Sequence, residues 1–470
     1  MIVARSFANE NVAVFGLARS GISAVRSLVA GGARVYAWDD KQAMRAEAEK
    51  AGAAVSPFKD WPQIRALILS PGIPLTHPKP HDVVLAARAM NAEVIGDMEL
   101  FAREIRPDAA KPGRAPIIAI TGTNGKSTTT ALIGHILASC GFNAEVGGNI
   151  GKAVLDLAAP TAKTIYVLEV SSYQIDLSPG LVPDVSILTN ITPDHIDRHG
   201  TLENYAAVKA RLLHQTAKDG LVIVGVDDPH SASIQTRLAS NGGAEAVPVS
   251  IGKVLGRGIF VLDGALYDAQ GQRATKVMDL NDAAHLPGAH NWQNAALAYA
   301  ATKPFVKDAR AIVAAIVDFP GLAHRIEDVG RIGKVRFIND SKATNAEAAE
   351  RALVCYPDIY WIAGGMPKEG GIENLAPHFS RIRKAYLIGE AANAFARTLE
   401  TRVPYEISHT LDRAVASAYI DSRKSAAAAP VVLLSPACAS FDQFKDFEER
   451  GEAFRAAVET LASEQVKEAS

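Results

Sequence analysis

The residues best suited to chemistry lie in one short turn between two apolar segments. The run Ile117–Ile120 enters Thr121-Gly122-Thr123-Asn124-Gly125-Lys126-Ser127-Thr128, and a helical pattern leaves it. A strand that turns through glycines into a helix directs backbone N–H groups and the positive end of the helix dipole at one point, which favours an anion. Lys126 adds a cation for the β- and γ-phosphates, and the Ser127 hydroxyl can ligate Mg²⁺. The turn therefore predicts a nucleotide site.

The spacing of this turn differs from the general phosphate-binding loop. The first glycine of that pattern would fall at Ile120, and this chain has Gly122 instead. The alternative is an ordinary strand–turn–helix with an incidental Gly-Lys-Ser. The order of strand, turn and helix favours the nucleotide site.

A second glycine turn lies near the N-terminus. Val12–Phe15 leads into Gly16-Leu17-Ala18-Arg19-Ser20-Gly21, and the next predicted strand ends at Asp39. The arrangement is similar to a dinucleotide-binding turn, in which an acidic residue binds the ribose hydroxyls. Ala18 at the middle glycine position leaves less room for a pyrophosphate, so a nucleotide-free layer of the same fold is the alternative. Ser70-Pro71-Gly72, after a later strand, favours a site at this sheet edge.

Over the whole chain, short β-rich runs alternate with Ala-rich helical stretches, which predicts parallel sheets covered by helices. A Pro- and charge-rich stretch, Arg106–Ala115, and a Pro-Gly near Phe319–Leu322 mark two boundaries. We expect an α/β protein with three tandem domains. They are a Rossmann-like domain over residues 1–112, a central P-loop domain over 113–320 and a Rossmann-like domain over 321–470.

Composition excludes several classes of function. The net charge is −2, whereas a nucleic-acid-binding domain is usually basic. The three cysteines, Cys140, Cys355 and Cys438, are far apart, which argues against a disulfide framework or a zinc site. The N-terminus lacks the apolar core of a signal peptide, and no apolar run reaches the roughly 18 residues of a membrane span. We therefore expect a soluble cytoplasmic protein with no nucleic-acid or membrane partner.

Further polar clusters follow predicted strands. These are Glu169-Val170-Ser171-Ser172-Tyr173-Gln174, Asn190-Ile191-Thr192-Pro193-Asp194-His195-Ile196-Asp197-Arg198-His199, Tyr205–Lys209, Gly288–Asn294, Asn339-Asp340-Ser341-Lys342-Ala343-Thr344-Asn345 and Ser435–Phe444. With the two glycine turns, they resemble the Mur ligase family in order over essentially the whole chain. The Asp340–Asn345 and Ser435–Phe444 runs are similar to the members that add D-glutamate. The resemblance implies that the three domains bind a UDP-linked substrate, ATP and an amino acid.

The resemblance also implies a reaction. Such ligases use ATP to turn a carboxylate into an acyl phosphate, which an amine then attacks. Negative charge builds on oxygen in each step, so cations and N–H donors should dominate the site. Lys126 would stabilise the γ-phosphoryl group. Ser127 and Glu169 would hold one Mg²⁺, and His195 would ligate a second.

Lys209 resembles a lysine that the family carbamylates. A desolvated lysine has a lowered pKa, and its neutral amine can react with CO₂ to form an anionic oxygen ligand for the metal. The residues alone would favour a plain exposed helix lysine. For Glu169 a capping or solvated carboxylate would be the ordinary interpretation, and for His195 a capping or surface hydrogen bond.

The remaining roles come from the same resemblance. ATP would contact Gly122–Thr128 together with Asn294, at the adenine, and His324, Arg325 and Asp340. The UDP-N-acetylmuramoyl-L-alanine substrate would contact Arg19, Ser20, Asp39, Ser70, Pro71, Gly72, Asn149 and His195. D-Glutamate would contact Lys342, Thr344, Lys368, Ser440 and Phe447. For Lys368 the alternative is a solvated charge, and for Phe447 it is core packing.

Rival interpretations stay open at this point. A related ligase could add L-glutamate or another amino acid, because chirality depends on a few contacts. Folylpolyglutamate synthetase shares the loop and the modified lysine, but it lacks a UDP-binding domain before the loop. A nucleotide switch would need only one metal, and an oxidoreductase would not need a γ-phosphate site. We expect a monomer.

Overall fold

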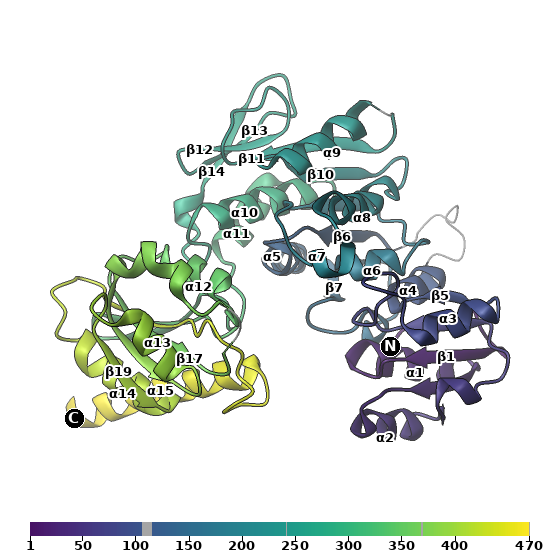
Figure 1. The fold of residues 1–470 in the computed structure, drawn as a ribbon. Helices are drawn as coiled ribbons and strands as arrows, with labels where there is room; N and C mark the ends of the chain where they lie inside the picture. Colours follow the sequence, from purple (N-terminus) through teal and green to yellow (C-terminus); the bar gives the residue numbers. More distant parts are fainter. Residues whose placement is uncertain (106–114, 241, 368–369, 470) are drawn as a thin grey trace. The chain divides into compact units, whose positions relative to one another are not determined.

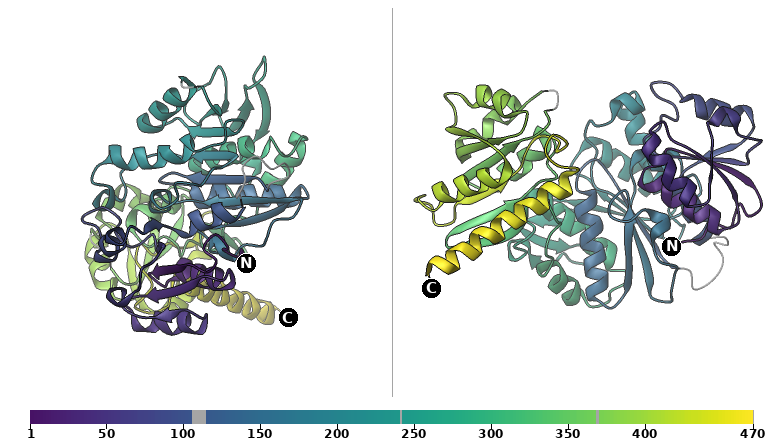
Figure 2. Two further views of the ribbon diagram at one scale, coloured as in Figure 1. Left: turned by 90° about the vertical axis from the view of Figure 1, so that its right-hand side faces the viewer. Right: turned by 90° about the horizontal axis from the view of Figure 1, so that it is seen from below.

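The computed structural model describes residues 1–105, 115–240, 242–367 and 370–469, with side chains described to residue 465. Apart from Ala115, the predicted linker Arg106–Ala115 lies outside these ranges. The chain forms two compact units: Met1–Ala284 with Ala289–Phe319, and His285–Gly288 with the residues from Pro320 onward. Each is described by itself (Figures 1 and 2). No helix among the described residues has the length and apolar character needed to cross a bilayer.

The first unit begins with a parallel five-stranded sheet in the order β3-β2-β1-β4-β5. Its strands are β1 (Asn11–Phe15), β2 (Arg34–Trp38), β3 (Ala54–Val55), β4 (Ala66–Leu69) and β5 (Glu93–Ile95), and its helices are α1 (Arg19–Ala30), α2 (Gln42–Lys50), α3 (Asp82–Ala89) and α4 (Asp97–Ile105). Successive strand side chains point to opposite faces. Val12 and Val14 accordingly join the cluster with α1 and α4, whereas Ala13 and Phe15 pack with α3.

The second sheet of this unit has nine strands in the order β14-β13-β12-β11-β10-β9-β6-β8-β7. The strands are β6 (Ile117–Thr121), β7 (Asn143–Gly148), β8 (Thr164–Glu169), β9 (Val185–Leu188), β10 (Leu221–Gly225), β11 (Glu245–Ser250), β12 (Ile259–Leu262), β13 (Ala265–Asp268) and β14 (Thr275–Asp279). Only the β12–β13 and β13–β14 pairs are antiparallel. β6 lies between β8 and β9, so its carboxyl end is flanked by those of two neighbours. Ligands of open α/β sheets bind at this edge.

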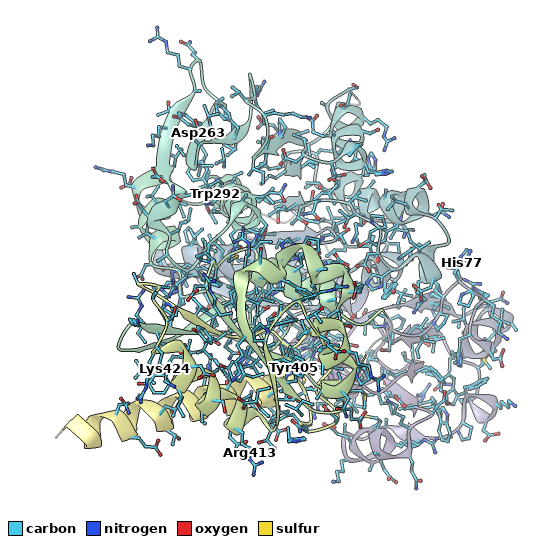
Figure 3. The ribbon with its side chains drawn as sticks, turned by 60° about the vertical axis from the view of Figure 1, so that its left-hand side comes forward. His77, Asp263, Trp292, Tyr405, Arg413 and Lys424 are labelled. Atoms are coloured by element: carbon cyan, nitrogen blue, oxygen red, sulfur yellow. The ribbon has the colours of Figure 1, made fainter. Side chains whose placement is uncertain are left out.

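Seven helices accompany the second sheet. They are α5 (Lys126–Ser139), α6 (Ser172–Asp176), α7 (Ile196–His199), α8 (Leu202–His214), α9 (Pro229–Ser240), α10 (Ala289–Thr302) and α11 (Ala309–Val317). Figure 3 labels Asp263, in the tight turn between β12 and β13, and Trp292 on α10. The Trp292 ring would lie 3.6 Å from a Cβ at Gly264, so the hairpin turn packs closely against α10.

The second unit contains a six-stranded sheet in the order β15-β16-β20-β17-β18-β19, in which only β15 runs antiparallel to its neighbour. Its elements are β15 (Glu327–Ile332), β16 (Val335–Asn339), β17 (Ile359–Gly364), β18 (Ile382–Ile388), β19 (Tyr405–His409), β20 (Val431–Leu434), α12 (Ala346–Leu353), α13 (Ala392–Leu399), α14 (Leu411–Ser422) and α15 (Phe447–Ala469). Trp361 packs on the face covered by α12 and α13, and Ile362 on the face covered by α14 and α15. The predicted α/β fold with three successive sheets is confirmed.

Candidate active site

The predicted nucleotide turn, residues 122–125 between β6 and α5, requires glycine at two positions. Gly122 has a φ of +140°, and a Cβ there would lie 1.9 Å from the Thr189 hydroxyl oxygen. Gly125 has a φ of +84°, and its Cβ would lie 2.3 Å from Oδ1 of Asn294. Residues with a side chain rarely adopt such backbone dihedrals, and at these distances a Cβ would force its neighbours to move. The two glycines therefore let the turn pass close to its neighbours before α5 begins at Lys126.

Residues after β9 hold the turn from the other side. The Asn190 carbonyl accepts from the Thr123 N–H at 2.8 Å, and Oδ1 of Asn190 accepts from the Asn124 N–H at 3.0 Å. The Thr189 hydroxyl donates to the Asn124 carbonyl at 2.6 Å. These bonds fix the first half of the turn, so the N–H groups for an anion are those at the start of α5. Sequence reasoning gave Thr189 no role, although it directly follows a buried strand.

Asn294 supports the turn from α10. Its side chain is 2% exposed, it donates to Oδ1 of Asn291 at 3.0 Å, and it accepts from the Thr129 hydroxyl at 3.2 Å. Both of its polar groups are thus used inside the protein, and its oxygen faces Gly125. In this arrangement, Asn294 positions the turn, and its contact with an adenine stays a prediction.

Two lysines converge on one carbonyl oxygen of the turn. Nζ of Lys126 donates to the carbonyls of Gly122 at 2.9 Å and Thr123 at 2.7 Å. Nζ of Lys209, from α8, donates to the same Gly122 carbonyl at 2.8 Å. Two ammonium groups that share an acceptor repel each other, so the arrangement favours one neutral amine.

The surroundings of Lys209 disfavour a positive charge on its amine. Its side chain is 1% exposed, and Nζ lies 4.5 Å from the centre of the Tyr205 ring. Burial, and then the charge of Lys126, lowers the pKa of Lys209 well below its ordinary value, opposed only in part by Asp194 and Glu169. The alternative of a plain exposed helix lysine is therefore wrong.

Glu169 ends β8 beside β6, paired with Ile120. The carboxylate is 1% exposed, and Oε1 accepts from Nδ2 of Asn149 at 2.6 Å. Oε2 is buried and has no hydrogen-bond partner among the described residues. A buried carboxylate oxygen without a partner is costly, and a cation would satisfy it. This donor therefore fits the predicted Mg²⁺, and the alternative of a solvated Glu169 is wrong.

His195 lies at the start of α7 with a φ of +53°. Its ring is 5.0 Å from the Tyr173 ring, and Nε2 is 3.4 Å from a carboxylate oxygen of Asp194. Burial lowers the pKa of His195, which favours the neutral imidazole that can ligate a metal. The charges of both Lys209 and Lys126 also act on this ring. The structure thus brings His195 into the neighbourhood of the two lysines.

Side chains alone do not build a complete metal site. Among the described residues, no three His, Cys, Asp or Glu side chains group closely enough to hold an ion. Mg²⁺ usually takes one or two protein carboxylates and completes its shell with phosphates and water. Glu169, the Ser127 hydroxyl and a nucleotide are compatible with that pattern.

The N-terminal glycine turn forms a second site region at the carboxyl edge of the first sheet. Gly16 has a φ of +88°, and a Cβ there would lie 2.6 Å from Cβ of Ser70, so the turn and the Ser70-Pro71-Gly72 segment are in close contact. Asp39 accepts from the N–H groups of Leu17 at 2.7 Å and Lys41 at 2.8 Å, which shapes the turn. Arg19 and Ser20 begin α1 beside it.

The second unit contains residues predicted to bind ATP or D-glutamate. The Lys342 N–H donates to the His324 carbonyl at 3.0 Å, and the Phe447 ring lies 6.4 Å from the His324 ring and 5.3 Å from Nζ of Lys342. Phe447 is half-buried at the start of α15. His324 itself is buried, with Nδ1 3.0 Å from Nδ2 of Asn339. Its ring therefore helps to hold the chain beside Lys342.

Asp340 is buried in the same cluster. Burial raises the pKa of its carboxyl to about 7, although the Ser435 hydroxyl donates to it at 2.8 Å. The charge of Arg325 acts in the opposite direction. The Thr344 N–H donates to the Lys342 carbonyl at 2.9 Å. Lys368 lies outside the described residues.

A buried arginine that sequence reasoning missed ties this cluster together. Arg450 donates to the hydroxyl and carbonyl of Ser341 at 3.0 and 2.9 Å, and to the carbonyls of Cys438 at 3.0 Å and Ala439 at 3.3 Å. It thereby joins the Asp340–Asn345 run to the segment that contains Ser440. The sequence carried no signal for this role, because a charged residue in a helix usually faces solvent.

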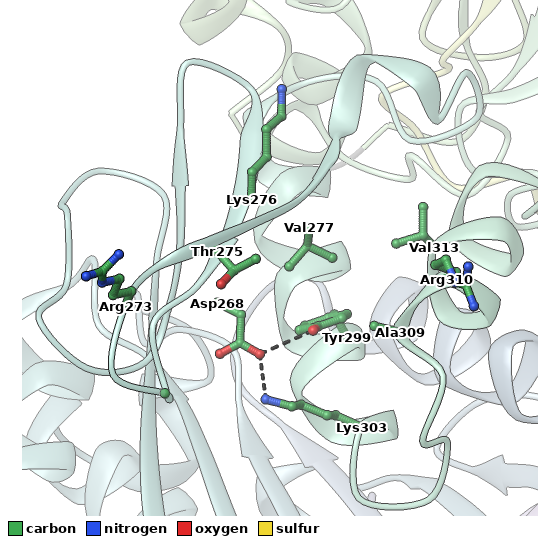
Figure 4. Close-up of a pocket in the computed structure, with 11 residues that line it drawn as sticks. Asp268, Arg273, Thr275, Lys276, Val277, Tyr299, Lys303, Ala309, Arg310 and Val313 are labelled. Carbon is green, nitrogen blue, oxygen red and sulfur yellow. Dashed lines mark hydrogen bonds and ion pairs between the residues drawn. The ribbon is translucent and has the colours of Figure 1, made fainter.

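One cavity of the first unit contains none of the predicted residues. It has a volume of about 430 Å³ and lies between β13, β14, α10 and α11. Figure 4 shows Tyr299 and Lys303 directed at Asp268, with hydrogen bonds of 3.2 and 2.5 Å. The sequence motifs do not point to this cavity.

Known proteins resemble this chain in sequence. Residues 120–302 match the Mur ligase middle domain. The chain is 53% identical over 467 residues to the UDP-N-acetylmuramoylalanine--D-glutamate ligase of Phenylobacterium zucineum, covering 99% of both chains. It is 54% identical to the enzyme of that name from Caulobacter vibrioides and 52% identical to that from Brucella abortus, covering 98% of each chain.

Solved structures share the fold at low identity. The UDP-N-acetylmuramate-alanine ligase of Thermotoga maritima is 16% identical, with a TM-score of 0.58, over 96% of this chain and 99% of that one. MurF from Acinetobacter baumannii is also 16% identical with a TM-score of 0.58, over 90% and 91%.

Proposed function

Because this chain belongs to the Mur ligase family, we propose that its first unit uses ATP to convert a substrate carboxylate into an acyl phosphate. The chain is an ATP-dependent ligase that adds D-glutamate to UDP-N-acetylmuramoylalanine in peptidoglycan synthesis. Relatives with this activity in their names match it from end to end at 52–54% identity. The acyl phosphate and the residue roles below are the proposal.

The proposed reaction has two steps. A carboxylate oxygen of the UDP-linked substrate attacks the γ-phosphorus of ATP, the bond to the β-phosphate oxygen breaks, and ADP leaves. The neutral amine of D-glutamate then attacks the acyl carbon, the carbon–oxygen bond to phosphate breaks, and a proton and phosphate are released. Charge moves between oxygens in both steps, so fixed cations and N–H groups lower the barrier.

The shared Gly122 carbonyl is the observation that carries the proposal. Lys126 donates to this carbonyl at 2.9 Å and Lys209 at 2.8 Å, within a turn that admits no Cβ at Gly122. We propose that Lys126 leaves the turn for the γ-phosphate, whose charge is the stronger acceptor. Residues Gly122–Thr128 would surround the phosphates, and Asn294 would hold the turn.

Bound Mg²⁺ would offset charge on the phosphate oxygens. Ser127 and Glu169 would hold one ion. The second would be held by His195 and by a carbamate on Lys209, formed when its neutral amine bonds to CO₂ and loses a proton. The low pKa of Lys209 and its burial support this modification, because both keep the amine uncharged.

The other sites follow the division between the two units. UDP and the muramoyl-alanine end would contact Arg19, Ser20, Asp39, Ser70, Pro71, Gly72, Asn149 and His195. D-Glutamate would contact Lys342, Thr344, Lys368, Ser440 and Phe447, and ATP would also contact His324, Arg325 and Asp340. Residues 1–112, 113–320 and 321–470 would be the three domains. We propose a monomer that acts in the cytoplasm, where ATP and UDP-linked precursors occur.

Amino-acid-dependent phosphate release tests the proposal. Purified protein would be given UDP-N-acetylmuramoyl-L-alanine, Mg-ATP and one amino acid from a panel of D- and L-enantiomers. Release should require both substrates and should be fastest with D-glutamate, and Lys126→Ala should abolish it. Hydroxylamine added without an amino acid should trap the acyl phosphate as a hydroxamate. Release without any trapped hydroxamate would contradict the proposed intermediate.

A further inference from the structure

Two arginines of the first unit cross between its two sheets in opposite directions. Arg19, the first residue of α1, reaches from the first sheet to the loop that follows β7. Its two terminal nitrogens donate to the carbonyls of Asn149 at 3.0 Å and Gly151 at 2.8 Å. An arginine that binds two carbonyls at once fixes both the distance and the angle of the loop, because the guanidinium is planar.

Arg198, in α7, reaches the other way. Its terminal nitrogens donate to the carbonyls of Gly72 at 2.9 Å and Ile73 at 3.1 Å, in the segment that follows β4 of the first sheet. Its guanidinium carbon also lies 4.5 Å from the centre of the Tyr173 ring, which holds the side chain in place. Each arginine thus donates hydrogen bonds to two main-chain carbonyls in a loop of the opposite sheet.

Each of the two loops contains a predicted site residue. Nδ2 of Asn149 donates to Oε1 of Glu169 at 2.6 Å, and the Asn149 backbone N–H donates to the Glu169 carbonyl at 2.9 Å. Gly72 lies in the turn that the Ile73 N–H closes by donating to the Ser70 carbonyl at 2.9 Å, beside Gly16. Arg198 is itself three residues from His195, and Tyr173 packs against both. The two contacts therefore connect the first sheet to the Glu169 and His195 positions.

We propose that Arg19 and Arg198 are positioning residues that hold the UDP-binding edge of the first sheet in register with the reacting centre of the second. Arg19 acts through Asn149 on Glu169, and Arg198 acts through the Ser70–Ile73 turn on the UDP-linked substrate. The resemblance to known ligases implied that Arg19 contacts UDP. Its guanidinium donates to the Asn149 and Gly151 carbonyls, and the contact with UDP stays a prediction. The metal and substrate consequences rest on the proposed function, whereas the contacts themselves do not.

Amide hydrogen exchange of the protein without ligands tests the contacts directly. Charge-assisted bonds of this kind are strong enough that Arg19→Ala should speed exchange in a peptide covering residues 147–151 by about tenfold or more. It should leave a peptide covering 70–73 unchanged. Arg198→Ala should give the reverse pattern. Arg26→Ala is the matched control, because Arg26 lies on α1 and pairs only with Glu47 among the described residues. Unchanged exchange in both loops would overturn the proposal.

Binding and kinetics then separate positioning from substrate contact. Arg19→Ala should weaken binding of Mn-ADP, measured without the UDP substrate, by about tenfold, as partners of metal ligands do. It should also lower kcat, whereas a simple UDP contact would raise only the KM for that substrate. Arg19→Lys should recover little, because an ammonium does not reproduce the planar two-point contact. Faster loop exchange with normal Mn-ADP affinity would remove the link to Glu169 and leave the proposed ligase chemistry intact.

Discussion

The carbonyl oxygen of Gly122 accepts hydrogen bonds from both Lys126 and Lys209. Two positive charges are disfavoured at such a short separation. Lys126 is half-buried at the start of α5, whereas Lys209 is almost fully buried beside the Tyr205 ring. Burial and the charge of Lys126 lower the pKa of Lys209, so loss of a proton is favoured at this lysine. A neutral, buried and nucleophilic amine next to a nucleotide turn is the condition that carbamate formation needs.

Replacement of Lys209 tests whether it serves as an anion. Lys209→Ala should lower phosphate release by about 100-fold or more, since a metal ligand would be lost. Acetate or formate added to this variant should restore part of the activity, because a short carboxylate can enter the space and replace the carbamate. Lys218→Ala, at an exposed position, should behave like the original protein. Near-normal activity of Lys209→Ala without any additive would contradict the role.

Alanine substitution at two glycines with a similar φ separates the effect of backbone strain from that of a close contact with Asn294. Gly125→Ala would place a Cβ 2.3 Å from Asn294, whereas Gly141→Ala, at a φ of +86° just after α5, would meet nothing within 4 Å. Both variants incur about 1–2 kcal/mol for a left-handed side-chain residue. Only Gly125→Ala should lose affinity for a fluorescent ATP analogue, by about tenfold or more. Equal affinities in the two variants would show that the contact with Asn294 is unimportant.

Residue chemistry of this kind was only partly predictable from the sequence. Glu169 and Lys126 could be found because the end of a parallel strand and the start of its helix define a position. The burial of Asn294 could not, since an Asn in an Ala-rich helix shows no sign of which neighbour it will meet. Arg450 was missed for the same reason. Contacts between distant segments depend on packing that local pattern does not encode.

Among the elements, buried parallel strands were the easiest to predict. Arg34–Trp38 and Val431–Leu434 form β2 and β20, because an apolar run of four or five residues bounded by turns suits a buried strand. The β12–β13–β14 hairpins and β19 were not anticipated. β12 and β13 are only four residues long, and β14 and β19 each begin with an exposed residue, so these strands resemble loops in a single sequence.

Helix α4 carries a buried acid that should make stability depend on pH. Burial raises the pKa of Asp97 to about 6, although Oδ1 accepts from the Met98 N–H at 3.0 Å. A carboxyl whose pKa is raised on folding stabilises the fold below its unfolded pKa, near 3.8, and this contribution is lost as the pH rises through the folded value. The free energy of unfolding should therefore fall by about 2 kcal/mol from this group between pH 4 and pH 7.

Asp97→Asn removes the ionisation and keeps an acceptor for the Met98 N–H. In urea titrations at several pH values, the variant should lose this part of the decline and should exceed the original protein in stability at pH 7. Asp82→Asn, in the first turn of α3, is a control in a similar helix position. An unchanged slope in Asp97→Asn would show that the carboxyl is no harder to ionise in the folded protein than in the unfolded one.

Across the whole chain, the described site residues fall into two groups that belong to different compact units. The nucleotide turn, Glu169, His195 and Lys209 lie in the first unit, and Lys342 with Phe447 lies in the second. Three α/β layers in sequence could be predicted because strand and helix patterns alternate throughout. The close association of the first two sheets could not, since it depends on contacts such as those of Arg19 and Arg198.

This division predicts that binding of the two kinds of substrate can be impaired separately. Lys342→Ala should raise the KM for D-glutamate by about tenfold or more, because the amino acid loses a charged partner for a carboxylate. It should leave the affinity for Mg-ATP unchanged, as measured by calorimetry. Lys126→Ala should abolish phosphate release and weaken Mg-ATP binding. Lys424→Ala, exposed and labelled in Figure 3, should change neither quantity. A Lys342→Ala variant that lost ATP affinity but kept its KM for D-glutamate would contradict the assignment of Lys342 to the amino acid.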